Sequence, residues 1–199
     1  MDNTLNFKDQ IRKVCRSGFA TLSSLWRASS RVRSIATKIQ IVHATIISQI
    51  DYCNSIYICL PNAEMKKLQR LMNGAVRFIY NLKRKDRDSI TYYLKKCHFL
   101  PVSLRSSFKI CCLVFKCVYG GAPKYLSNLL EKKQSLPSLR INSDTSLLQQ
   151  THLNKENYKN RAFSVIAPIL WNELPREIRE CASLPIFKVK LKTHYFNKF

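Results

Sequence analysis

The stretch from residue 34 to 58 carries an apolar stripe with helical spacing. Its members follow one another at intervals of three or four residues: Ile35, Ile39, Val42, Ile46, Ile50, Cys53 and Tyr57. Residues at this spacing share one face of an α-helix, whereas a half-buried strand needs an apolar residue at every second position. The stripe therefore predicts a long amphipathic helix over 34–58.

Other parts of the chain show the same spacing. Residues 5–30 and 63–80 each carry an apolar helical face, and Asn62, which follows Pro61, is in a position to cap the second of these helices. Shorter helices are expected at about 89–96, 101–119, 124–132, 175–181 and from residue 185 onward. Only four glycines are present, which argues against the many turns of an all-β fold. The predicted fold class is mainly α.

The polar segment 133–160 divides this helical pattern. It is rich in Ser, Asn and Gln, and it has no clear hydrophobic period. We therefore expect an N-terminal helical segment over 1–33, a helical bundle over 34–132, an irregular polar linker over 133–160 and a small C-terminal helical unit over 161–199.

The charge balance of the chain is extreme. Its 34 Lys and Arg residues exceed its 12 Asp and Glu residues, which gives a net charge of +22. Such a surface repels itself unless a polyanion neutralises it, so nucleic acid is the leading candidate partner. The sequence shows neither a secretory signal nor an apolar run of membrane-spanning length. We expect an intracellular protein, in the cytoplasm or the nucleus, with no membrane partner and with reduced cysteines.

Three separated strings are the most distinctive pieces of the sequence. They are Ser48-Gln49-Ile50-Asp51-Tyr52-Cys53-Asn54 with Leu60-Pro61; His98-Phe99-Leu100-Pro101 with Phe108-Lys109-Ile110 and Gly121-Ala122-Pro123-Lys124-Tyr125-Leu126; and Arg161-Ala162-Phe163-Ser164 with Trp171-Asn172-Glu173-Leu174-Pro175 and Phe187-Lys188-Val189-Lys190-Leu191-Lys192. In this order the strings resemble the C-terminal part of the reverse transcriptase of jockey-type non-LTR retrotransposons. The resemblance covers essentially the whole chain.

The resemblance implies a helical bundle like a polymerase thumb, which holds the template–primer duplex by its backbone. It also implies that the catalytic palm is missing, since the opening segment resembles the one that follows the last palm strands. Polymerase chemistry needs two Mg²⁺ ions held by acidic side chains, and no two of the six Asp residues are adjacent. We expect a truncated polymerase fragment that binds RNA or DNA, with no catalytic residue, metal site or cofactor of its own.

The eight cysteines suggest a metal site as one interpretation. Cys111, Cys112 and Cys117 lie close to the Cys97-His98 pair in the sequence. Zinc sites, however, combine a C-x2–4-C pair with a second pair at similar spacing, and this form is absent. Apolar neighbours surround these cysteines in the sequence, so we expect them to behave as small buried residues. The Trp171-Asn172 pair offers no catalytic chemistry, and we expect Trp171 to lie in the core and Asn172 to cap a turn.

The helix predicted at 63–80 carries a row of cations opposite its apolar face. The predicted nucleic-acid-binding residues on this helix and just beyond it are Lys66, Lys67, Arg70, Arg77, Lys83, Arg84, Lys85 and Arg87. Lys66, Arg70 and Arg77 share their face with Asn73. Long cations on one rigid element can follow the regularly spaced phosphates of a strand. The alternative is an ordinary solvated helix surface.

Two other functions stay open at this point. The reading frame could be a genomic relic whose product has no selected function. It could also encode a protein-interaction module, in which helices such as the one predicted over 34–58 bind a partner other than the missing palm. For a polymerase fragment, the protein partners would be the missing palm domain or another copy of the polymerase. A large exposed apolar patch would favour the second alternative.

Overall fold

The computed structural model describes residues 7–58, 60–83, 89–131, 147–150 and 162–199, and these residues are mainly α-helical. The chain divides into two compact units. Unit 1 comprises Met1–Arg105 together with Phe199, and unit 2 comprises Ser106–Lys198. The predicted fold class, mainly α, is confirmed.

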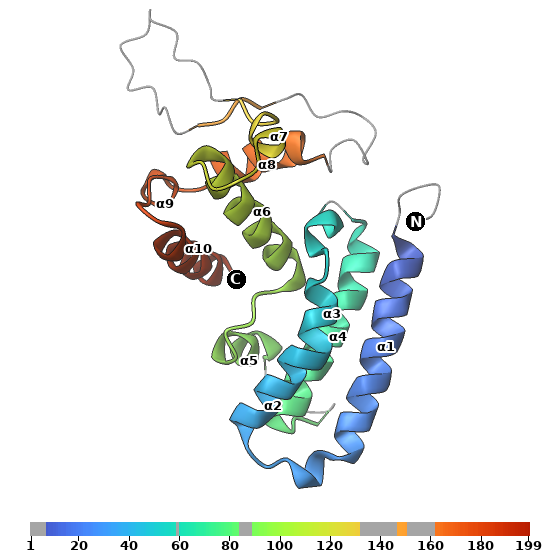
Figure 1. Cartoon of the computed structure of the whole chain (residues 1–199). Helices are drawn as coiled ribbons and strands as arrows, with labels where there is room; N and C mark the ends of the chain where they lie inside the picture. Colours follow the sequence, from blue (N-terminus) through green and yellow to red (C-terminus); the bar gives the residue numbers. More distant parts are fainter. Residues whose placement is uncertain (1–6, 59, 84–88, 132–146, 151–161) are drawn as a thin grey trace, which may run out of the picture. The chain divides into compact units, whose positions relative to one another are not determined.

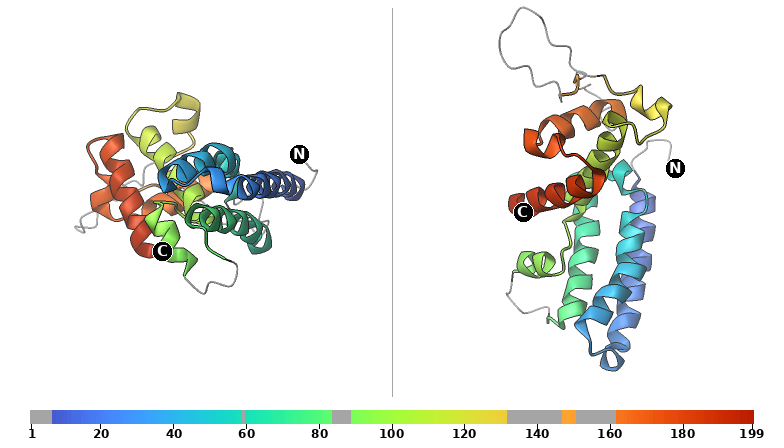
Figure 2. Two further views of the ribbon diagram at one scale, coloured as in Figure 1. Left: turned by 90° about the horizontal axis from the view of Figure 1, so that it is seen from below. Right: turned by 60° about the vertical axis from the view of Figure 1, so that its left-hand side comes forward.

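Unit 1 is built around three helical rods that lie side by side (Figures 1 and 2). Its elements in chain order are α1 (Lys8–Arg27), a 3-10 turn (Ser29–Arg31), α2 (Ile35–Val42), a π-helical turn (His43–Ile47), α3 (Ser48–Asp51), a 3-10 turn (Asn54–Tyr57), α4 (Asn62–Tyr80) and α5 (Ile90–Lys96). The segment from α2 to α3 forms one rod, and α1 and α4 form the other two. Because α1 and α4 each run opposite to the α2–α3 rod, they are parallel to each other.

The helix predicted at 34–58 is present only as far as Asp51. Val42, Ile46 and Ile50 are four residues apart and completely buried. The π-helical turn at His43–Ile47 explains how residues at this spacing stay on one side of the rod. A wider π turn takes up the extra residue that successive steps of four introduce, so the apolar side keeps its direction. Cys53 then has a left-handed backbone, with φ of 51°, which ends the rod. The prediction was therefore wrong beyond Asp51, where Cys53 is exposed.

Two glycines allow α1 and α4 to approach closely. A Cβ atom on Gly18 would lie 2.4 Å from the Leu71 Cδ2 atom, and one on Gly74 would lie 2.9 Å from the Leu22 Cδ2 atom. Farther along the line of contact between α1 and α4, which we call the seam, the Trp26 ring meets the Phe78 ring edge-on, with centroids 5.5 Å apart. These contacts set the two helices in a parallel register.

The expected starts of the other helices are correct to within a residue, but the helix expected over 5–30 begins at Lys8, and the helix Phe163–Asn172 was not predicted. The expected cap of α4 is also wrong. Asn62 is the first residue of α4, and Pro61 occupies the capping position without a side-chain hydrogen bond. Ser34 does cap α2, because its hydroxyl accepts a hydrogen bond from the backbone N–H of Thr37.

Unit 2 contains the remaining helices. They are α6 (Val102–Val118), whose first turn belongs to unit 1, α7 (Lys124–Ser127), α8 (Phe163–Asn172), α9 (Arg176–Arg179) and α10 (Leu184–Lys198). Trp171 is completely buried beside Phe187, which stacks on Phe115 with a centroid distance of 4.5 Å. The expectation that Trp171 lies in the core is confirmed.

The neighbouring Asn172 does not cap a turn as predicted. Its amide group pairs with the backbone of Leu148, donating to the Leu148 carbonyl at 2.8 Å and accepting from the Leu148 N–H at 2.9 Å. Leu148 is itself buried. A part of the segment predicted to be a linker is thus held against the end of α8 by one side chain.

Candidate nucleic-acid interface

A shallow hollow with a volume of about 340 Å³ lies between α1 and α4 in unit 1. We call it the α1–α4 groove. Its lining residues are Arg12, Cys15, Arg16, Phe19, Lys67 and Arg70. Four of the six are cationic, and no acidic side chain is among them.

Helix geometry explains why these cations converge. Arg12 and Arg16 are four residues apart on α1, and Lys67 and Arg70 are three apart on α4, so each pair lies on one side of its helix. The parallel contact of α1 with α4 brings these two sides together along the edge of the seam. The close contact at Gly18 and Leu71 lies next to the groove, so the seam positions the cations.

The cations of the groove differ in their own partners. Arg12 pairs with Asp9 at 2.6 Å, and Lys67 pairs with the buried Glu64 at 2.8 Å. Among the residues that the structure describes, Arg16 and Arg70 have no hydrogen-bond or ion-pair partner. The exposed Arg12–Asp9 pair contributes little to stability because solvent screens it. An anion in the groove would therefore meet two unpaired guanidinium groups.

The remaining lining residues give the groove an apolar border. Phe19 leaves 43% of its surface exposed, so its ring is accessible to a ligand. Burial raises the pKa of the Cys15 thiol, and the nearby Lys67 charge opposes this rise only in part. The thiol is thus protonated at neutral pH and unsuited to act as a nucleophile. Cations beside an accessible ring suit a strand of nucleic acid, whose phosphates are anionic and whose bases stack.

The structure separates the residues predicted to bind nucleic acid. Lys67 and Arg70 line the groove, and Lys66 is exposed on α4 one residue away. Arg77 is half-buried, and its guanidinium donates a hydrogen bond to the carbonyl of the exposed Lys83 at 3.0 Å. Arg77 thus fastens the turn that follows α4. The other three predicted residues, Arg84, Lys85 and Arg87, lie outside the described residues.

Asn73, which shares the predicted face, has a structural contact. It accepts a hydrogen bond from Gln69, whose amide oxygen accepts from the backbone N–H of Val102 at 3.0 Å. This side of α4 therefore holds the first turn of α6. Of the predicted cations on α4, only Lys67 and Arg70 line the groove beside α1.

Sequence reasoning missed Arg12 and Arg16. Their four-residue spacing on a predicted helix was a usable signal, because it places both on one face. No local pattern joins that face to the cations of α4, because only the packing of α1 on α4 brings them together.

The cysteines show no arrangement for metal binding in the part of the chain that the structure describes, where no three His, Cys, Asp or Glu side chains gather. Cys111 is completely buried, and burial raises its pKa to about 12. Cys97 is also buried, and its Sγ lies 3.6 Å from the Tyr80 hydroxyl. None of the described helices has the length and apolar character needed to cross a membrane.

Comparisons of the chain with protein-family models, with curated proteins and with solved structures find no match.

Proposed function

We propose that this protein binds RNA or DNA through the phosphate backbone and that the α1–α4 groove is the main contact. The observation that carries the proposal is the convergence of Arg12, Arg16, Lys67 and Arg70 from two helices on one hollow. A net charge of +22 supplies the long-range attraction, and the groove gives a strand a place to lie.

The binding proposed here is independent of base sequence. Lysine and arginine side chains that contact phosphates position a strand without reading its bases. Phe19 adds a ring on which any base can stack, since every base has a π face. The groove thus fits a protein that holds a strand while another component acts on it.

The resemblance to non-LTR reverse transcriptases suggests which component that is. We propose that the chain corresponds to the thumb and C-terminal region of such a polymerase, with the three-rod bundle of unit 1 as the thumb-like part. The chain would hold a template–primer, and the palm would supply the acidic residues for nucleotide addition. This proposal rests on the three sequence strings, and the helical fold is compatible with it.

Salt-dependent binding tests the groove. Each cation that contacts a phosphate releases about one condensed counterion, so the slope of log K against log [salt] counts the contacts. Changing Arg12, Arg16 and Arg70 together to Gln keeps good helix formers and removes three charges. The magnitude of the slope should fall by roughly two to three units on single-stranded and duplex DNA.

Two control variants isolate the groove from net charge. Changing Lys188, Lys190 and Lys192 on α10 to Gln removes the same charge from unit 2, and the slope should change by less than about one unit. Lys66→Gln removes one exposed charge beside the groove. This variant should change the salt slope less than Arg70→Gln, which removes a charge that lines the groove. If the α10 variant changes the slope as much as the groove variant, net charge alone binds and the groove proposal is wrong.

A further inference from the structure

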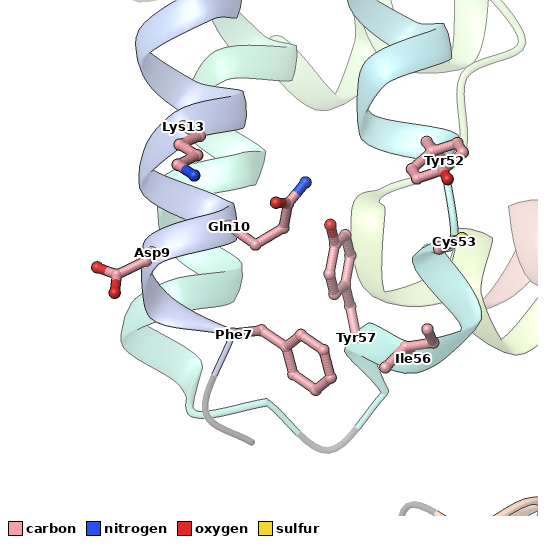
Figure 3. Close-up of a pocket in the computed structure, with 8 residues that line it drawn as sticks. All are labelled: Phe7, Asp9, Gln10, Lys13, Tyr52, Cys53, Ile56 and Tyr57. Atoms are coloured by element: carbon pink, nitrogen blue, oxygen red, sulfur yellow. The ribbon is translucent and has the colours of Figure 1, made fainter. Parts of the chain in front are cut away.

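Unit 1 contains a second, larger cavity between the start of α1 and the segment that follows α3. It has a volume of about 500 Å³, within the range of pockets that bind small molecules. The residues that line it are Phe7, Asp9, Gln10, Lys13, Tyr52, Cys53, Ile56 and Tyr57 (Figure 3). None of the six residues that line the α1–α4 groove also lines this cavity.

The backbone on both sides of this cavity is unusual. Phe7 and Cys53 are two of the four non-glycine residues with positive φ in the described part of the chain, at 52° and 51°. A left-handed conformation is unfavourable for residues with a Cβ atom, and such residues concentrate at functional sites. Cys53 turns the chain away from the α3 rod, and this turn leaves Tyr52 with 70% of its surface exposed at the cavity.

The lining combines aromatic rings with hydrogen-bonding groups. Phe7 and Tyr57 meet edge to face, with ring centroids 6.4 Å apart. Tyr57 is buried, which raises the pKa of its hydroxyl and keeps the phenol neutral, and Gln10 hydrogen-bonds to it. Figure 3 shows the polar ends of Gln10 and Tyr57 directed toward each other. A planar ligand with polar edges could contact the exposed Tyr52 ring and these two polar groups.

Lys13 connects this cavity to the α1–α4 groove. It is exposed on α1, lines the cavity, and lies three residues before Arg16, which lines the groove. Residues three apart are neighbours on a helix surface and differ by about 4.5 Å along the axis. Lys13 and Arg16 are therefore neighbours on the surface of α1, one lining the cavity and the other the groove, and the acidic Asp9 of the cavity lining is paired with Arg12.

We propose that this cavity binds one unpaired nucleotide of the strand that lies in the groove. The base occupies the aromatic cavity against Tyr52, and Lys13 contacts the phosphate. Nucleotides supply the planar base, the polar edges and the anionic group that this lining can recognise together. The inference rests on the proposed function and adds to it a preference for single-stranded over fully paired nucleic acid.

Tyr52→Ala in the full chain tests the stacking part of the proposal. Tyr52 is largely exposed, so its removal should leave the unfolding midpoint unchanged. Fluorescence anisotropy with a labelled 12-nucleotide single strand should show affinity falling by at least about fivefold. A blunt 12-base-pair duplex should bind within about twofold of the unchanged protein, since its bases are not free to enter. Tyr52→Phe keeps the ring and should bind like the original chain.

Tyr125→Ala is the matched control, because Tyr125 is 74% exposed and belongs to unit 2. It should leave both affinities unchanged. Lys13→Gln should lower the single-strand salt slope by about 0.7, whereas Tyr52→Ala should leave that slope unchanged because it removes no charge. If Tyr52→Ala binds the single strand normally while the groove variant still loses its salt slope, the nucleotide pocket is wrong and the groove proposal holds. If neither Tyr52→Ala nor the groove variant changes binding, the nucleotide pocket and the groove proposal are both wrong.

Discussion

The two units of this protein use different interiors and present their cations differently. Unit 1 packs aliphatic side chains around a glycine-mediated helix contact, and its cations converge on the α1–α4 groove. Unit 2 packs aromatic rings around Trp171, and α10 carries Lys188 and Lys190 on its exposed side. Lys190 on α10 donates to the carbonyl of Glu177 at 3.5 Å, and Lys192 lies over the Phe196 ring. Both units are basic, but the lysines of α10 do not line the α1–α4 groove.

The comparison shows that charge density alone does not define a binding site. A groove needs two elements at a fixed spacing, and in unit 1 that spacing depends on Gly18 and Gly74. Substitutions that alter each interior therefore test whether binding follows unit 1, as we propose.

The largest effect is expected from Trp171→Ala in unit 2. Removing a completely buried Trp leaves a cavity and should lower the free energy of unfolding by about 3–5 kcal/mol, measured by urea denaturation. The salt slope for duplex DNA should stay unchanged under conditions where the variant is folded, because all groove residues belong to unit 1. A reduced slope would show that the binding site depends on unit 2.

Gly18→Leu should destabilise unit 1 by adding volume to its interior, whereas Trp171→Ala removes volume from unit 2. A side chain at this position meets the Leu71 Cδ2 atom and forces α1 away from α4. The free energy of unfolding should fall by about 3 kcal/mol, at the upper end for overpacking. The salt slope should also fall, since the cations of the two helices separate. Ser17→Leu adds the same side chain at an exposed neighbouring position and should change neither quantity appreciably.

The sequence predicted much of this fold but only half of the groove. Helices with a regular apolar period, such as α4, were predicted within one or two residues because their own sequence specifies the buried face. Lys67 and Arg70 were found for the same reason. Arg12 and Arg16 were missed because their role depends on a tertiary contact at Gly18, which no local period encodes.

The cavity beside Tyr52 was even less predictable from local sequence patterns than the groove. It exists because the backbone turns at Cys53, where the apolar period predicted that the helix would continue. Cys53 fitted the stripe, so the local pattern pointed to the wrong structure. The contact between Asn172 and Leu148 was equally hidden, because Leu148 lies in a polar segment without any period.

Asn172→Ala should have an intermediate effect, and only in unit 2. It removes two hydrogen bonds to the Leu148 backbone, each of which contributes about 1 kcal/mol, so the free energy of unfolding should fall by about 2 kcal/mol. Amide hydrogen exchange should show faster exchange at Leu148, which loses its acceptor. Asn128→Ala, an exposed position in unit 2, is the control and should leave the exchange at Leu148 unchanged. Unchanged exchange at Leu148 in Asn172→Ala would mean that the amide pairing does not hold this segment.

The smallest effect is a loss of stability at alkaline pH through Cys111 in unit 2. Burial, partly opposed by a contact with Tyr195 at 3.5 Å, raises the pKa of the Cys111 thiol from 9.0 to about 12. The folded state thus keeps a proton that the unfolded chain releases above pH 9, and stability must fall as the pH rises from there toward 12. At one pH unit above the unfolded pKa the loss from this thiol is about 1.4 kcal/mol. The free energy of unfolding should therefore fall by about 1.4 kcal/mol more in the original chain than in Cys111→Ala between pH 8 and pH 10. Equal losses in the two proteins would show that Cys111 is ionised as readily in the folded state as in the unfolded one.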